Sequence, residues 1–494
     1  MDDILPKLLN FPQHPPPPNP LSDQQYDEGI RAQISVVKNI PNSKLLQPTS
    51  GGENVLDIIN PSVNSVPYTF ILIANIEAAQ RNDKNIDQEN LWNSIIAFLA
   101  QFDPRQMRYM QTELSQILDI FSNMARRHHQ IPTAIPHIRD ALLRFEPTGT
   151  LLTPKHLLLV KLALEAKQFD DVLPVIDKTI LYIPGAGHRP RQKYLCNICL
   201  PPAAYITVQT GFVAKPLKHL EVLEYFLLSG QVYIGLKKWK RASECLEVAV
   251  TYPTKDSGPS KVMTEAYKKW ILVRLLMDGK MPVLPKVTSP GAAKVLKVLG
   301  KPYETVAQIF EQGTASRLKS ELEAGRDLWT TDCNMGLVMC VMAAYQQFQI
   351  KNLANVHTKL TMVDIHNLTQ SAEIGSKLPN AAAVETLVQS MIADGTLHAT
   401  LSHPPNQSPV LTFSPNGPLL TEKQTQAALA ASSTRIKALT EEIKTTDRML
   451  MYEKEYVNYA KKMKKNAAAG LEHGVGVNDM DFLGEDEDLM GSLY

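Results

Sequence analysis

Apolar residues recur at helical spacing from about residue 66 to residue 350, and no alternating strand pattern interrupts them. In one window the spacing i, i+3, i+4 and i+7 is met by Leu114, Ile117, Leu118 and Phe121. Helices joined by short turns bury their apolar faces chiefly against one another. The pattern therefore predicts paired helices stacked in series, and a mainly α fold.

A degenerate internal repeat supports this arrangement. The tetratricopeptide (TPR) pattern places small residues where two antiparallel helices approach and bulky residues around them. Within 226–253 the required positions are filled by Phe226, Gly230, Tyr233, Ala242, Leu246 and Ala249. A weaker copy has Val160, Ala163, Val172 and Ile176. We predict a TPR-like helical solenoid over residues 55–350.

Three segments depart from the helical pattern. Residues 1–54 contain the run PQHPPPPNP, in which proline removes backbone donors, and we predict a largely disordered leader. A ligand for a proline-reading module is the alternative. Residues 184–216 are rich in proline and glycine near their start and predict an irregular excursion between repeats. Residues 467–494 form an acidic segment predicted to be disordered.

Residues 351–415 change character and predict a winged helix. A helix over 351–361 and a shorter one near 363–370 precede a helix with one apolar face, formed by Val384, Leu387, Val388, Met391 and Ile392. The turn signal Asp394-Gly395 follows, and then the alternating residues Leu397, Ala399 and Leu401. A loop, HPPNQSP, leads to a return strand over 410–413 that contains Val410, Leu411 and Phe413.

The charge of this region argues against DNA binding. Winged helices that bind DNA neutralise phosphates with Lys and Arg. Across residues 363–414 the one basic residue, Lys377, stands against four acidic residues, a net charge of −3. The expected recognition helix over 380–393 has no Lys or Arg. We therefore expect the wing to meet other proteins, for example by adding a strand to a neighbouring sheet.

Residues 420–466 predict one long helix with a thin apolar seam. One row repeats every seven residues, at Leu429, Ile436, Ile443, Leu450 and Val457. The companion row is poor, at Ser432, Leu439, Thr446, Glu453 and Ala460. Such a seam is too narrow to stabilise an isolated helix, so partner helices are expected. The alternative is that the same residues pack onto the chain's own solenoid.

No pattern for catalysis or for a resident cofactor occurs. The metal-hydrolase pattern HExxH and the nucleophile elbow GxSxG are absent from the sequence. Cys196 and Cys199 form a single CxxC, whereas structural zinc needs four ligands. His188 and His219 are the other ligands that zinc could recruit, and free thiols are the alternative. We predict no enzyme activity, no cofactor and no metal.

Charge and cysteine content limit the remaining classes. The formal net charge is +1, with no global bias toward polyanions. Two short basic clusters, Arg126-Arg127-His128-His129 and KKMKK (461–465), lack interleaved aromatic residues, which makes solvated faces the simpler interpretation. The five cysteines favour reduced thiols and an intracellular protein. The apolar stretches are too short for a membrane span.

A solenoid followed by a winged helix, with MIADGTLHATL (391–401) at the helix–wing junction, resembles the PCI family. Its members are scaffold subunits of the proteasome lid, the COP-9 signalosome and translation initiation factor three. The segments YKKWILV (267–273) and DCNMGLV (332–338), with GLKKWKRASECLEVAV (235–250), are most similar to signalosome members. The similarity is good over about 220–415 and weak before it.

The resemblance implies a noncatalytic scaffold in the complex that removes a ubiquitin-like modifier from cullins. A different, zinc-bearing subunit hydrolyses the bond. Winged helices of the family associate side by side, which maps to Leu397, Ala399, Leu401, Val410, Leu411 and Phe413. Its C-terminal helices form a bundle, which maps to Leu429, Ile436, Leu439, Ile443, Leu450 and Val457.

The partners implied are other PCI subunits and the metal-bearing subunit, in a hetero-oligomer of the cytoplasm and nucleus. Direct binding to nucleic acid or membrane is not expected. The alternatives are a PCI subunit of the proteasome lid or of another PCI complex, and a nucleic-acid-binding PCI adaptor.

Overall fold

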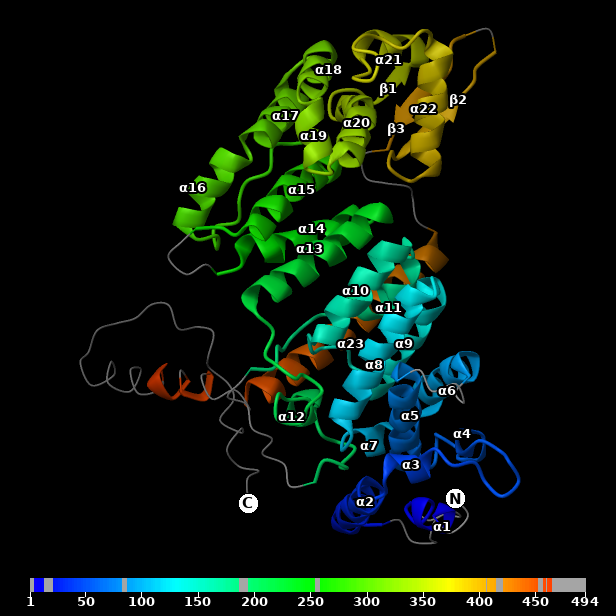
Figure 1. Cartoon of the computed structure of the whole chain (residues 1–494). Helices are drawn as coiled ribbons and strands as arrows, with labels where there is room; N and C mark the ends of the chain where they lie inside the picture. The colour runs from blue at the N-terminus through cyan, green and yellow to red at the C-terminus, as the bar shows by residue number, and fades with distance from the viewer. Residues whose placement is uncertain are drawn as a thin grey trace, which may run out of the picture.

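The computed structural model describes residues 4–12, 21–81, 87–185, 194–253, 258–405, 407–414, 421–451, 456–458 and 460–463. Helices follow one another in a long stack, a small winged-helix unit lies at one end of it, and a long helix comes last in the chain (Figure 1). The prediction of a mainly α fold with helical repeats is confirmed.

The leader is more ordered than its prolines indicate. Its helices are α1 (Leu5–Leu8), α2 (Asp23–Lys38) and α3 (Asn42–Leu45), followed by α4 (Val55–Ile58). Ser22 caps α2 in a capping box with Gln25, and one face of α2 buries Tyr26, Ile30 and Val37. The prediction of a largely disordered leader was therefore wrong for residues 23–38. Residues 13–20 of the proline run lie outside the described residues.

The solenoid has two groups of helices. The first comprises α5 (Ser65–Gln80), α6 (Gln88–Gln101), α7 (Pro104–Met107), α8 (Gln111–Arg127), α9 (Ile131–Phe145), α10 (Pro154–Ala166), the 3₁₀ turn η1 (Asp170–Val172) and α11 (Leu173–Ile176). The second comprises α13 (His219–Gly235), α14 (Trp239–Thr251), α15 (Lys261–Asp278), α16 (Pro290–Leu299), α17 (Lys301–Gln312), α18 (Ala315–Ala324), α19 (Arg326–Thr331) and α20 (Met335–Leu353). One apolar core runs through both groups.

The repeat residues lie where the TPR pattern requires them. A Cβ atom added at Gly230 of α13 would lie 3.0 Å from the Leu246 side chain and 3.6 Å from the Ala242 carbonyl oxygen of α14. Leu246 and Ala242 are fully buried. A larger residue at position 230 would require the Leu246 side chain to shift, so glycine favours the close approach of the two helices. In the weaker copy α10 is complete, but its partner helix is reduced to η1 and α11.

The excursion packs as a strap, which we define as residues 194–216. It contains α12 (Pro202–Tyr205) and lies against α7 and α8, to which it is joined by hydrogen bonds between residues 87 to 94 positions apart in the chain. The guanidinium of Arg108 stacks 4.0 Å from the centre of the Tyr205 ring and donates to the carbonyl oxygens of Leu195 and Asn197. The Gln111 amide donates to the Tyr205 carbonyl oxygen at 2.8 Å.

The winged helix contains a strand that the sequence interpretation missed. Its elements are β1 (Lys359–Thr361), α21 (Met362–Leu368), α22 (Ala381–Ala393), β2 (Ala399–Ser402) and β3 (Val410–Phe413). The sheet is antiparallel in the order β1-β3-β2, with Leu360 opposite Leu411. The predicted helix over 351–361 was wrong: α20 ends at Leu353, and residues 359–361 pair with β3. A three-residue strand is too short to show alternation, and a distant strand determines its state.

After the winged helix, α23 (Glu422–Leu450) forms a 29-residue helix. It covers most of the described part of the long helix predicted over 420–466. Residues 467–494 lie outside the described residues, so the disordered acidic segment stays a prediction.

A buried carboxylate at the end of α9 gives the first testable prediction. Glu146 is 4% exposed, and the Thr148 hydroxyl donates to its Oε1 atom. Its Oε2 atom is buried without a hydrogen-bond partner among the described residues. Burial raises the pKa of Glu146 to about 7, against the opposing effect of hydrogen bonds from Thr148 and nearby backbone groups.

Replacing Glu146 with glutamine is expected to stabilise the protein increasingly as pH rises. Because the folded-state pKa exceeds the ordinary value of 4.5, the stability linked to this carboxyl is present below that value and is lost as pH rises through about 7. Between about pH 5 and pH 8 the difference in unfolding free energy between Glu146→Gln and wild type should grow by roughly 1–3 kcal/mol. Urea unfolding of both proteins at the two pH values measures this difference in unfolding free energy, and the exposed Glu53→Gln is the control. An unchanged difference contradicts the prediction.

Candidate protein-interaction surface

The strands of the wing divide the predicted interface residues into two groups. Leu397, Leu411 and Phe413 are 5%, 0% and 5% exposed and lie in the winged-helix core with Val384 and Val388 of α22. Because β3 is the middle strand, its core-facing side chains are covered from both sides. The prediction that these three side chains face a partner is therefore not supported. Ala399, Leu401 and Val410 are half-buried.

The wing presents backbone hydrogen-bonding groups, rather than apolar side chains, to a partner. Strand β3 pairs with β1 on one side and β2 on the other, whereas β2 pairs only with β3 among the described strands. Along β2, Thr400 and Ser402 are exposed, and they alternate with the half-buried Ala399 and Leu401. An outer strand with free N–H and C=O groups can take a further strand from another protein.

The exposed face of α22 carries no cation. It presents Ala382, Thr386, Gln389 and Ser390. The only ionisable residue on this helix, Glu385, lies 2.8 Å from the His403 ring nitrogen in the wing. A helix without Lys or Arg has no side chain that can neutralise a phosphate or form the bidentate contact with guanine.

Helix α23 exposes its apolar row. Leu429, Ile436 and Ile443 are 66%, 64% and 62% exposed, and Leu439 in the companion row is 47% exposed. Leu450 and Val457 are half-buried. The four exposed side chains do not pack onto the solenoid, which was the alternative interpretation. They recur at helical spacing on one side, so α23 presents a narrow apolar seam to its surroundings.

The two segments that carried the strongest resemblance meet in space. Lys268 on α15 donates to the Asp332 carboxylate at 2.7 Å, and the Tyr303 hydroxyl donates to the same oxygen at 2.7 Å. The Asn334 amide donates to the Tyr303 hydroxyl oxygen at 2.8 Å. Burial alone would raise the pKa of Asp332, but the bonds from Lys268 and Tyr303 lower it. The network joins α15 and α17 to the start of α20, whose Ile350 enters the winged-helix core.

The CxxC cysteines are not arranged as metal ligands. The Cys196 thiol is buried and donates to the Asp23 carbonyl oxygen at 3.2 Å, while Cys199 is exposed. His219 pairs with the Tyr252 hydroxyl at 3.0 Å, and His188 lies outside the described residues. Within the described ranges no group of three or more His, Cys, Asp and Glu side chains is placed to hold a metal ion.

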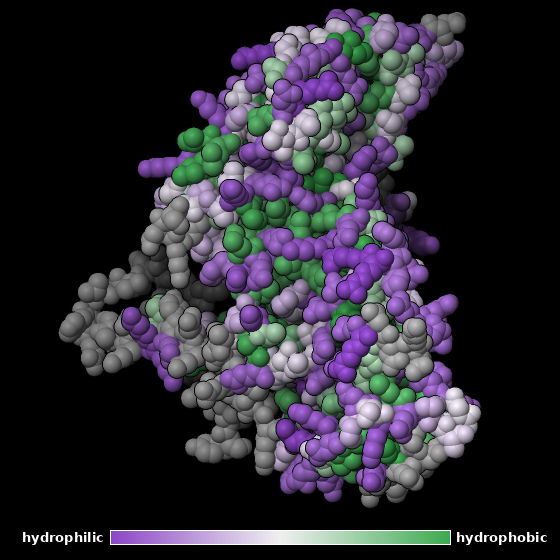
Figure 2. Space-filling view, viewed as in Figure 1, coloured by the Kyte–Doolittle hydropathy of each residue, from purple (hydrophilic) through white to green (hydrophobic). Residues whose placement is uncertain are grey.

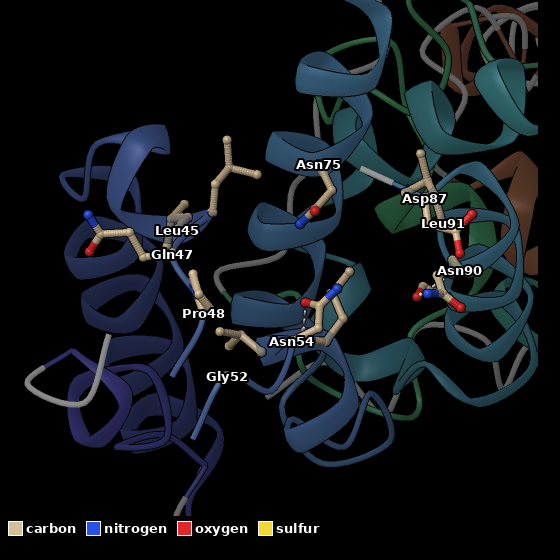
Figure 3. Close-up of a pocket in the computed structure, with 13 residues that line it drawn as sticks. Leu45, Gln47, Pro48, Gly52, Asn54, Asn75, Asp87, Asn90 and Leu91 are labelled. Carbon is tan, nitrogen blue, oxygen red and sulfur yellow. Dashed lines mark hydrogen bonds between the residues drawn. The ribbon is translucent and has the colours of Figure 1, made fainter. Parts of the chain in front are cut away.

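A cavity of about 500 Å³ lies between the α3–α4 connection and helices α5 and α6 (Figure 3). Amide and aliphatic side chains line most of it, among them Asn54, Asn75 and Asn90. Asn75 donates to the Ile71 carbonyl oxygen, and Asp87 caps α6 by accepting from the Glu89 backbone N–H. The ionisable side chain in the lining thus caps a helix. Among the helices described, none is both long and apolar enough to cross a membrane.

Comparison with known proteins agrees with this architecture. The family description "COP9 signalosome complex subunit 3, N-terminal helical repeats" matches residues 33–291. COP9 signalosome complex subunit 3 of Neurospora crassa is 36% identical, over 100% of this chain and 99% of its own length. The protein of the same name from Emericella nidulans is 33% identical over 99% of both chains.

Proposed function

The chain belongs to the COP9 signalosome complex subunit 3 family, and on this basis we propose that it is a noncatalytic scaffold subunit of that complex. The observation that carries the proposal is the exposed apolar seam of α23. A 29-residue helix with Ile436 and Ile443 more than half exposed needs other helices to cover it.

In the proposed assembly the chain makes two kinds of contact. The α23 seam joins a bundle of helices from other PCI subunits, and the open edge of β2 pairs with the winged helix of a neighbour. The solenoid fixes the orientation of both, because α20 is shared between the solenoid core and the winged-helix core. A separate zinc-bearing subunit then removes the ubiquitin-like modifier from cullins. We place the chain in the cytoplasm and nucleus, which imaging of a tagged chain would test.

Native mass spectrometry of complexes purified through a tag on this chain tests the proposal. The expected result is a hetero-oligomer that contains further PCI subunits and one metal-bearing subunit, and that removes the modifier from cullins. The purified chain alone should show no such activity. Recovery of proteasome-lid subunits instead, or a lone monomer, would refute the assignment to this complex.

A gel shift with unspecific RNA at low salt examines the nucleic-acid adaptor. In the basic cluster 126–129, which this alternative requires, the Arg126 guanidinium pairs with Glu165 at 3.1 Å, and the other three residues are exposed. KKMKK extends beyond the described residues. We expect no shift.

A further inference from the structure

One face of the second helical group is apolar, and no element among the described residues covers it. We define the valine–lysine face as residues 280–301, which comprise α16 and the segment before it. Ala292 and Leu296, 1% and 0% exposed, hold α16 against the core. The other side of the face exposes Val283 (87%), Val287 (77%), Val295 (40%), Val298 (72%) and Leu299 (49%). Figure 2 shows hydrophobic residues gathered over α16 among hydrophilic ones.

The same face has a single sign of charge. Residues 280–301 contain five lysines and no acidic residue, and all five lysines are exposed: Lys280, Lys286, Lys294, Lys297 and Lys301. Among the described residues no ion pair involves any of them. On α16, Lys294 and Lys297 stand beside Val295 and Val298, so a cationic row runs next to an apolar row.

The cationic row beside the apolar row indicates which class of molecule can bind to this face. An apolar stripe beside uncompensated ammonium groups fits a peptide that alternates acidic and apolar residues. Single-stranded nucleic acid is a poorer fit, because it binds on exposed aromatic side chains, and the exposed apolar residues of this face are valine and leucine. An anionic lipid surface is the remaining competitor, and the experiment below separates it.

Among the segments outside the described residues, one has the required chemistry. Residues 479–494, DMDFLGEDEDLMGSLY, hold six acidic residues within 479–488, interleaved with and followed by apolar ones such as Phe482, Leu483, Leu489 and Met490. The segment lies outside the described residues. The linker 464–478, fifteen residues after the last described residue, can span up to about 50 Å when extended. We propose that residues 479–494 dock on the valine–lysine face of the same chain.

The docking combines two effects. Apolar side chains of the acidic segment cover the valines and remove them from water. Carboxylates of residues 485–488 lie near the α16 lysines, where the attraction weakens as salt is raised. Val295 and Val298 are then covered by a segment of the same chain. In the free subunit this covers an apolar patch that would otherwise promote aggregation.

Zero-length carbodiimide cross-linking of the full chain tests the proposal, because the reagent joins a lysine to a carboxylate in direct contact. Cross-links from Lys294 and Lys297 to residues 485–488 are expected, at least about tenfold above those from Lys237 and Lys240. That control pair is exposed, has the same spacing and lies beside or on α14. An equal mixture of ¹⁴N- and ¹⁵N-labelled chains should give cross-links within one isotope. Cross-links between isotopes, or none above the control pair, overturn the proposal.

Charge reversal supplies a second measurement on the full chain. Lys294→Glu with Lys297→Glu should raise amide hydrogen exchange over residues 479–494 at low salt, whereas Lys237→Glu with Lys240→Glu should not. Protection of the same segment unchanged by the first pair contradicts docking on this face. Sedimentation with phosphatidylserine vesicles that needs Lys294 and Lys297, without cross-links to residues 485–488, assigns the face to lipid and also overturns the proposal.

Discussion

Replacing Ile436 and Ile443 together with aspartate is expected to release the chain from its complex while the solenoid stays folded. Both side chains are mostly exposed in the chain itself, at 64% and 62%, so the substitutions remove little contact within the fold. In a helix bundle each would bury an unpaired carboxylate, at a cost of at least about 2 kcal/mol. Together the two correspond to roughly a thousandfold loss of affinity.

Co-purification of the other subunits through the tagged variant measures this effect. The matched control is Ala427→Asp with Thr434→Asp, which has the same seven-residue separation on the opposite, exposed side of α23. The control should retain its partners, and circular dichroism should show equal helix content in both variants. Retention of all partners by the Ile436/Ile443 variant would mean that the seam of α23 does not mediate assembly.

Trp329→Ala is expected to destabilise the fold by about 3–5 kcal/mol, the range for emptying a large aromatic site in a core. Trp329 is 1% exposed, its indole nitrogen donates to the Leu322 carbonyl oxygen at 3.0 Å, and its ring meets Tyr303 edge-on at 4.7 Å. Removal of the ring also loosens Tyr303, which holds the carboxylate that joins α15 to α20. The second helical group should therefore lose stability first.

Urea unfolding followed by far-UV circular dichroism measures the loss, and Trp329→Phe separates its two causes. Phenylalanine keeps most of the apolar contact but leaves the Leu322 carbonyl without its donor, so its effect should be smaller, about 1–3 kcal/mol. The half-buried Trp239→Ala is a control for tryptophan removal as such. Equal destabilisation by all three substitutions would rule out a special role for the Trp329 site.

Local signals predicted the helices well and the strands less well. The window from Leu114 to Phe121 is helical, and α8 spans it. Its helical state depends on residues in neighbouring turns of the same segment, so a local pattern is enough to predict it. Strand β1 is three residues long, and its partner β3 follows about 50 residues later, so nothing local identifies it. In α2 the signals were present, a serine cap and buried residues at helical spacing, but the adjacent proline run dominated the interpretation.

The interaction surfaces show that a sequence pattern can predict a strand or helix without showing which of its side chains are exposed. Alternation along the wing predicted strands, but it cannot tell which alternating set faces the core, and Leu411 and Phe413 lie inside. The sequence analysis did not identify the valine–lysine face. Val295, Val298 and Leu299 are exposed, but their spacing also fits an apolar stripe that is buried in a core. The absence of acidic residues across 280–301 was the signal that could have identified it.

The strap changes how the solenoid comes apart. In an open stack each helical pair contacts only its neighbours, and unfolding can begin at an end and advance unit by unit. Here Arg108 and Gln111 hold backbone groups 87 to 94 residues further along the chain, so α7 to α12 form a closed loop. Closing such a loop delays folding, and opening it requires many contacts to break at once. We expect the segment from α7 to α12 to unfold in one cooperative step, without earlier local unfolding at its ends.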